Sequence, residues 1–65
     1  MPETEMTRSL LEQEALAHRR RAEQFRTVAE GTRSPKIKSI LKDMADAADQ
    51  HAVRLEAHLR MLKTG

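Results

Sequence analysis

Apolar side chains recur every three or four residues in two segments of the chain, the spacing of one face of an α-helix. We predict the first helix from about residue 5 to residue 30, and its apolar row is Leu11, Ala15, His18, Ala22, Phe25 and Ala29. We predict the second from about residue 35 to residue 63, with the row Ile37, Leu41, Met44, Ala48, His51, Leu55, His58 and Leu62. Both rows alternate steps of four and three residues, as in helices that pack along their length against a neighbour.

Residues 31–34 carry the signals of a turn between the two helices. Gly31 suits the left-handed residue that follows many helices. Ser34 can cap the next helix, and Pro35 suits a first helical position because its missing N–H had no partner there. So short a connection makes the helices antiparallel. We therefore predict an all-α fold, an antiparallel two-helix hairpin that forms one domain over residues 1–65.

The second predicted helix carries another apolar row beside the first one. Its members are Ala45, Ala48, Ala52, Leu55, Leu59 and Leu62. Two adjoining rows require two neighbouring helices, and a hairpin supplies only one. A chain of 65 residues with one Phe and no Trp, Tyr or Cys also has little with which to stabilise itself alone. We predict a homodimeric four-helix bundle whose interface contains Leu11, Phe25, Met44, Leu55, Leu59 and Leu62.

Charge is unevenly distributed, although the net charge is only +2. Residues 1–18 sum to −3, residues 19–42 to +6 and residues 43–65 to −1. The hairpin would therefore have a basic turn end and an acidic open end. Two hairpins with their turns at opposite ends would bring opposite charges together, and salt would weaken this preference.

The basic region raises the alternative of an RNA- or DNA-binding dimer. Its candidate phosphate contacts are Arg19, Arg26, Arg33, Lys36, Lys38 and Lys42. Without Tyr or Trp the chain has little on which to stack single-stranded bases, so a duplex or loop junction is the expected target. The competing interpretation is a solvated helix face whose arginine stems cover apolar neighbours.

Three histidines fall on the apolar rows, and the antiparallel register places His18 close to His51, with Glu14 one turn away. Glu14, His18 and His51 could hold Zn²⁺ or iron in a ferritin-like bundle. The other interpretations are ordinary half-buried polar side chains, which we favour, and an interface that loosens when the imidazoles are protonated. We predict no cofactor.

Enzymatic function is not expected. The serines Ser9, Ser34 and Ser39 have no recognisable base, and two glycines cannot make a phosphate-binding loop. No apolar run is long enough for a membrane span, and the N-terminus does not resemble a signal peptide, so we expect a cytoplasmic protein. The predicted function is a small interaction or regulatory module that acts as a homo-oligomer through contacts with itself or another protein.

The central part of the chain resembles a group of short uncharacterised bacterial helical-hairpin proteins. The resemblance covers about residues 19–52 and rests on the run Arg21-Ala22-Glu23-Gln24-Phe25-Arg26-Thr27-Val28-Ala29-Glu30, then Ser34-Pro35, Leu41, Met44-Ala45 and Ala52. Ser34 stands where that group has a turn Asp, Ala48 where it has Tyr and His51 where it has Leu. The resemblance implies a hairpin and no particular activity. In length and plan the chain is also similar to the Rop family of RNA-binding hairpins, which dimerise with opposed turns; this analogy is architectural.

Overall fold

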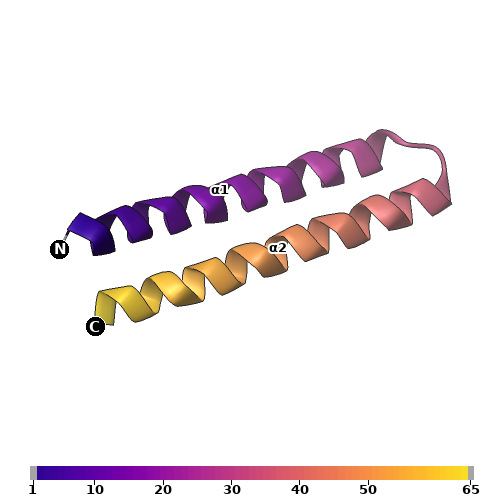
Figure 1. The fold of residues 1–65 in the computed structure, drawn as a ribbon. Coiled ribbons are helices and arrows are strands. Elements are labelled where there is room, and N and C mark those ends of the chain that lie inside the picture. Colours follow the sequence, from indigo (N-terminus) through magenta and orange to yellow (C-terminus); the bar gives the residue numbers. More distant parts are fainter. Residues whose placement is uncertain (1, 65) are drawn as a thin grey trace.

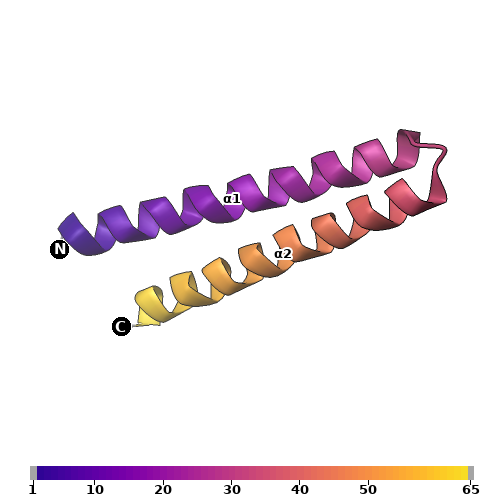
Figure 2. The same cartoon turned by 45° about the vertical axis from the view of Figure 1, so that its right-hand side comes forward.

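The computed structural model describes residues 2–64, with side chains from residue 5 to residue 62. Helix α1 spans Pro2–Gly31 and helix α2 spans Pro35–Thr64, 30 residues each. The helices lie side by side and antiparallel, so the two ends of the chain meet at one end of a rod and the turn forms the other (Figures 1 and 2). No strand occurs within residues 2–64. The Cα atoms extend over 51 × 14 × 11 Å. The predicted all-α hairpin is confirmed.

The turn is held by Ser34, which caps α2 as predicted. The Ser34 hydroxyl oxygen accepts a hydrogen bond from the Ile37 amide at 3.3 Å, and its carbonyl accepts one from the Lys38 amide at 2.9 Å. Pro35 is the first residue of α2. Capping thus satisfies amides that would otherwise lack partners at the start of the helix.

The predicted left-handed conformation of Gly31 is wrong. Gly31 has no positive φ and belongs to α1. The Thr32 amide still donates to the Val28 carbonyl at 3.1 Å, so the helical hydrogen-bond pattern continues past the glycine. The chain then reverses over residues 32–34, where the Ser34 amide donates to the Thr32 hydroxyl at 3.4 Å. Helix α1 also begins earlier than expected, at Pro2 rather than near residue 5.

The contact between the helices is made of alanine. The buried apolar side chains among the described residues are Ala15, Ala22, Ala29, Ala45, Ala48 and Ala52. Those of α1 are seven residues apart and so form one row along the helix. Because each side chain is a single methyl group, the two backbones can approach closely. No large side chain and no charged side chain is fully buried in the described part of the chain.

The two apolar rows of α2 have different surroundings. The row that begins at Ala45 faces α1, since Ala45, Ala48 and Ala52 are all buried. The row that begins at Ile37 is covered only in part: Ile37 is 49% exposed and Met44 44% exposed, whereas Ala48, which both rows share, is buried. The first row is therefore filled within the hairpin, and the second keeps exposed members on its outer side.

Enlarging an alanine of the contact should push the helices apart. We expect Ala22→Leu to lower the free energy of unfolding by about 1–3 kcal/mol, because Ala22 is fully buried against Ala45 and Ala48. Ala57→Leu is the matched control, since Ala57 is exposed and both residues favour helix. Urea unfolding at one protein concentration measures both. Equal stability of the two variants would contradict an alanine contact.

Candidate interaction surface

The hairpin has two long faces of different chemistry, separated by the buried alanine row. Successive residues of a helix point about 100° apart. Arg19 and Arg26 therefore flank one side of the row Ala15, Ala22 and Ala29, and His18 and Phe25 flank the other. We call the arginine side the ionic face. We call the histidine side the apolar face. Besides His18 and His51 it carries Phe25, Ile37, Ile40, Met44, Leu55 and Leu62.

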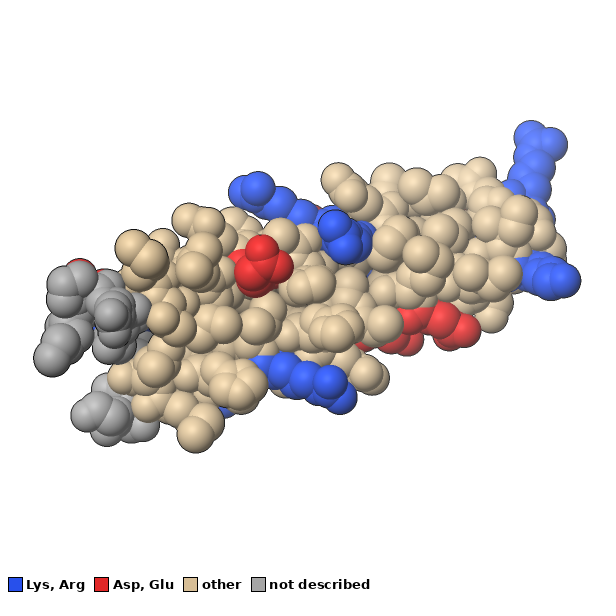
Figure 3. Space-filling view, in the orientation of Figure 1, with Lys and Arg blue, Asp and Glu red and all other residues tan. Residues whose placement is uncertain are grey.

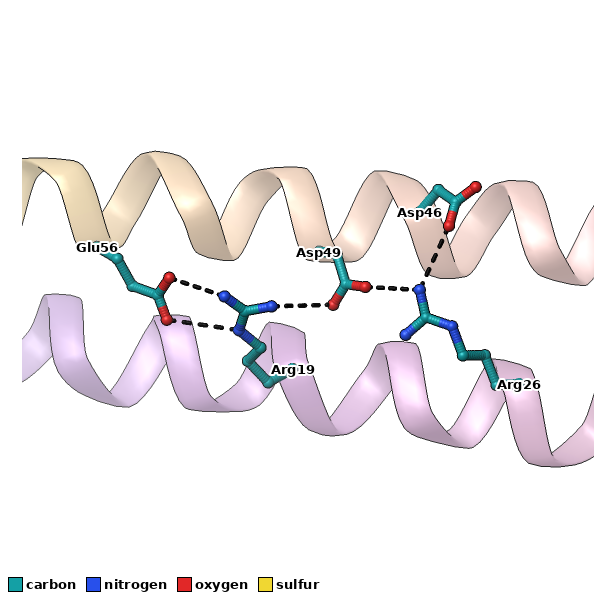
Figure 4. Close-up of polar contacts among 5 residues, drawn as sticks. All are labelled: Arg19, Arg26, Asp46, Asp49 and Glu56. Atoms are coloured by element: carbon teal, nitrogen blue, oxygen red, sulfur yellow. Dashed lines mark hydrogen bonds and ion pairs between the residues drawn. The ribbon is translucent and has the colours of Figure 1, made fainter.

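On the ionic face, two arginines of α1 and three carboxylates of α2 form a continuous ladder (Figure 4). Arg19 binds both oxygens of Glu56, at 2.8 and 3.4 Å, and reaches Asp49 at 3.5 Å. Arg26 binds the other oxygen of Asp49 at 2.6 Å and Asp46 at 3.3 Å. Asp49 thus accepts from both arginines and joins the two halves. The ladder connects positions up to 37 residues apart in sequence and so fixes the antiparallel register.

The ladder changes the titration of its central carboxylate. The hydrogen bond from Arg26, with the positive charges of Arg26 and Arg19, holds the pKa of Asp49 below the ordinary aspartate value. The hydrogen bond to Glu56 in turn raises the pKa of Arg19. All five side chains remain partly exposed, so each pair contributes little by itself and the ladder acts mainly by fixing register.

The ladder engages two of the six basic residues predicted to contact nucleic acid. Arg19 and Arg26 hold carboxylates, so a phosphate would have to displace Asp49 or Glu56. The other four surround the turn end and form no ion pair within the described residues: Arg33, Lys36, Lys38 and Lys42. Lysine and arginine side chains extend from this end of the molecule (Figure 3). The turn end therefore carries four of the six candidate residues without ion pairs among the described residues, whereas Arg19 and Arg26 belong to the ladder.

The apolar face is the one turned to the viewer in Figure 3, where uncharged side chains dominate the length of the rod and charged ones are scattered. Figure 4 shows the opposite face of the hairpin. In both pictures α1 runs from left to right, but it lies above α2 in Figure 1 and below α2 in Figure 4. Of the predicted interface residues, Met44 is exposed, and the other five are half-buried: Leu11, Phe25, Leu55, Leu59 and Leu62. At the open end of the face, Leu11, Leu55 and Leu62 line an almost entirely apolar groove with Thr7, His58 and Met61.

His18 and His51 lie side by side at the middle of the apolar face, as the antiparallel register predicts. Their ring centroids are 5.2 Å apart, with 22° between the ring planes. Glu14 is exposed one turn away. No group of three or more His, Cys, Asp or Glu within the described residues is placed to hold a metal ion. The predicted three-ligand set Glu14, His18 and His51 is therefore not assembled by a single chain.

Comparison of the chain with models of protein families, with curated proteins and with solved structures gives no match. The two-helix hairpin is consistent with the helical-hairpin resemblance drawn from residues 19–52, which rests on that residue pattern. Neither helix, over the residues described, contains an apolar stretch long enough to cross a bilayer.

Neutralising Asp49 should destabilise the hairpin in a pH-dependent way. Because the folded-state pKa of Asp49 is lowered, its stabilising contribution is complete above the ordinary aspartate pKa and is lost as pH falls through the lowered value. We expect Asp49→Asn to melt a few degrees below the wild type near pH 7, and the difference to shrink as the pH falls below the ordinary aspartate pKa.

Asp43→Asn removes a carboxylate of α2 that lies outside the ladder, so it is the matched control. It should melt close to the wild type at pH 7. Thermal melting followed by circular dichroism from acid to neutral pH measures all three proteins. If the two variants lose the same stability, Asp49 has no special role and the ladder does not fix the register.

Proposed function

We propose that this protein is a non-enzymatic interaction module that works as a homodimer, two hairpins pairing through their apolar faces into a four-helix bundle. The observation that carries the proposal is the open second row of α2, where Ile37, Met44 and His51 continue a helix-packing pattern with no helix against it. A second copy of the chain has a matching surface, because a two-fold axis packs this row of one copy against the same row of the other.

The solvent-accessible area of the chain supports pairing with a second copy of the hairpin. The chain exposes 5342 Å². A compact monomer of 7.4 kDa would expose about 4,200 Å², so the excess is about 1,100 Å². A standard interface buries about 800 Å² on each partner. The hairpin thus exposes more surface than a self-sufficient domain of its mass, by an amount that one pairing would cover.

Charge favours a pairing with the turns at opposite ends. The turn end carries Arg33, Lys36, Lys38 and Lys42 without ion pairs among the described residues. The open end carries the exposed carboxylates Glu5, Glu12 and Glu14. Opposed turns would place each basic tip beside the partner's acidic end, which aids association and fixes orientation more than it adds affinity. A bundle of this kind would serve a regulatory or scaffolding role by contact, with itself or with another protein.

Association should be visible as concentration-dependent stability. We expect light scattering to give twice the 7.4 kDa chain mass, and melting temperature to fall on dilution, since dissociation and unfolding are then linked. High salt should weaken the association modestly by screening the opposed ends. A chain that stays monomeric and melts at one temperature over a hundredfold dilution would overturn the proposal.

A charge on the apolar face should separate the copies. Ile40 and Val53 are both on α2 and are 50% and 54% exposed, but Val53 follows Asp49 by four residues and so lies on the ionic side. We expect Ile40→Glu to raise the dimer dissociation constant at least hundredfold, because each copy would bury an unpaired carboxylate. Val53→Glu, with the same new side chain at equal exposure, should dimerise like the wild type. Sedimentation equilibrium measures both, and equal dissociation constants would show that the apolar face is not the interface.

A further inference from the structure

We infer that the paired apolar faces form a metal site in which His18 and His51 of both copies bind one divalent transition-metal ion, a centre that is incomplete in a single chain. The inference rests on the homodimer proposed above. It concerns the place on that face where two imidazole rings, one from each helix, lie side by side.

The histidine pair occupies the middle of the rod. Each histidine is the seventeenth of the 30 residues of its helix, 16 residues after Pro2 or Pro35. At 1.5 Å per residue, both lie about 2 Å from their helix midpoints. Two such hairpins that overlap along their full length bring their middle layers together, whether the turns lie at the same end or at opposite ends. Four imidazoles would then share one layer of the bundle.

The ring nitrogens of this pair are available. His58, on the same face, has its Nδ1 at 3.0 Å from the Arg54 carbonyl oxygen, so that ring is held by its own helix. Neither His18 nor His51 forms a hydrogen bond within the described residues, and their one recorded contact is with each other. The two rings line a shallow depression together with Arg21, Phe25, Met44, Ala47 and Ala48.

The spacing of the rings suits a shared tetrahedral ion. With Zn–N distances of about 2.0–2.1 Å, two imidazoles on one tetrahedral zinc have ring centroids about 5 Å apart. The observed separation is 5.2 Å. Rotation about Cβ–Cγ redirects the nitrogens of each ring while its centroid stays nearly in place, so the ligand geometry can form without moving either helix.

The ligand set indicates the class of metal. Neutral imidazole suits Zn²⁺, Ni²⁺ and Cu²⁺, whereas Mg²⁺ and Ca²⁺ require oxygen ligands. A single chain offers two imidazoles and no third His, Cys, Asp or Glu in position among the described residues. The second copy supplies the missing two ligands and completes a four-nitrogen site. Metal and dimer would therefore stabilise each other.

The test uses the full chain without an affinity tag, because a histidine tag would itself bind metal. Sedimentation equilibrium and calorimetry with ZnCl₂ at neutral pH should give one Zn²⁺ per two chains. Zinc at a hundred times its dissociation constant should tighten dimerisation about hundredfold. The effect should weaken as the solution is acidified, since metal binding requires deprotonated imidazole. Co²⁺ should give the visible absorption of a tetrahedral centre.

The variants separate this site from the proposed dimer. His18→Asn with His51→Asn should abolish the zinc effect and still dimerise without metal, whereas His58→Asn should respond to zinc like the wild type. If the wild type dimerises but zinc changes nothing, or binds one ion per chain, the metal site is wrong and the dimer stands. If the chain is monomeric with and without zinc, both proposals fail.

Discussion

Close contact between two helices through methyl groups is the constraint on which the rest of this molecule depends. Ala22, Ala45 and Ala52 are fully buried where the two helices meet, and a side chain of one methyl group allows the backbones to approach closely. The larger apolar side chains lie beside this contact, where Phe25 and the leucines of the apolar face are half-buried. Ile37, Ile40 and Met44 remain exposed there.

The two faces lie on either side of this contact. On one side the space beside the alanine row is filled by long charged side chains, which can bridge the helices and keep their charged groups in water. On the other side it is filled by Phe25, Met44 and the two histidines. These side chains do not bridge the helices with charged groups held in water. The ladder of Arg19, Arg26, Asp46, Asp49 and Glu56 forms in the same register that places His18 beside His51. The ion pairs on one face and the histidine pair on the other are therefore consistent with a single alignment of the two helices.

Much of this fold could be predicted from the sequence, because its signals are local. Ser34 and Pro35 define a helix start by themselves, and the alanine and leucine periodicity identifies both helices. The conformation of Gly31 could not be predicted, since it depended on whether the Thr32 amide would continue the helical pattern. The ladder was missed although the register was predicted, because the apolar rows do not indicate which charged side chains beside them, such as Arg19 and Glu56, pair across the helices. The seven-residue spacing shared by Arg19 with Arg26 and by Asp49 with Glu56 was the available signal.

The choice between the two apolar rows of α2 shows what periodicity leaves open. Both rows repeat with the same steps, so spacing alone cannot say which one faces α1. The size of the side chains decides: the row with Ala45 and Ala52 allows close approach, and the row with Met44 and His51 does not. The row with the larger side chains remains available for a second contact. At its middle lies His51, and His18 occupies the equivalent position of α1. A polar layer in an otherwise apolar bundle weakens association but fixes alignment, because any shifted pairing would leave the imidazoles against apolar side chains. In the proposed dimer, the stacked pair of His18 and His51 would therefore favour the pairing that brings the middle layers of the two hairpins together.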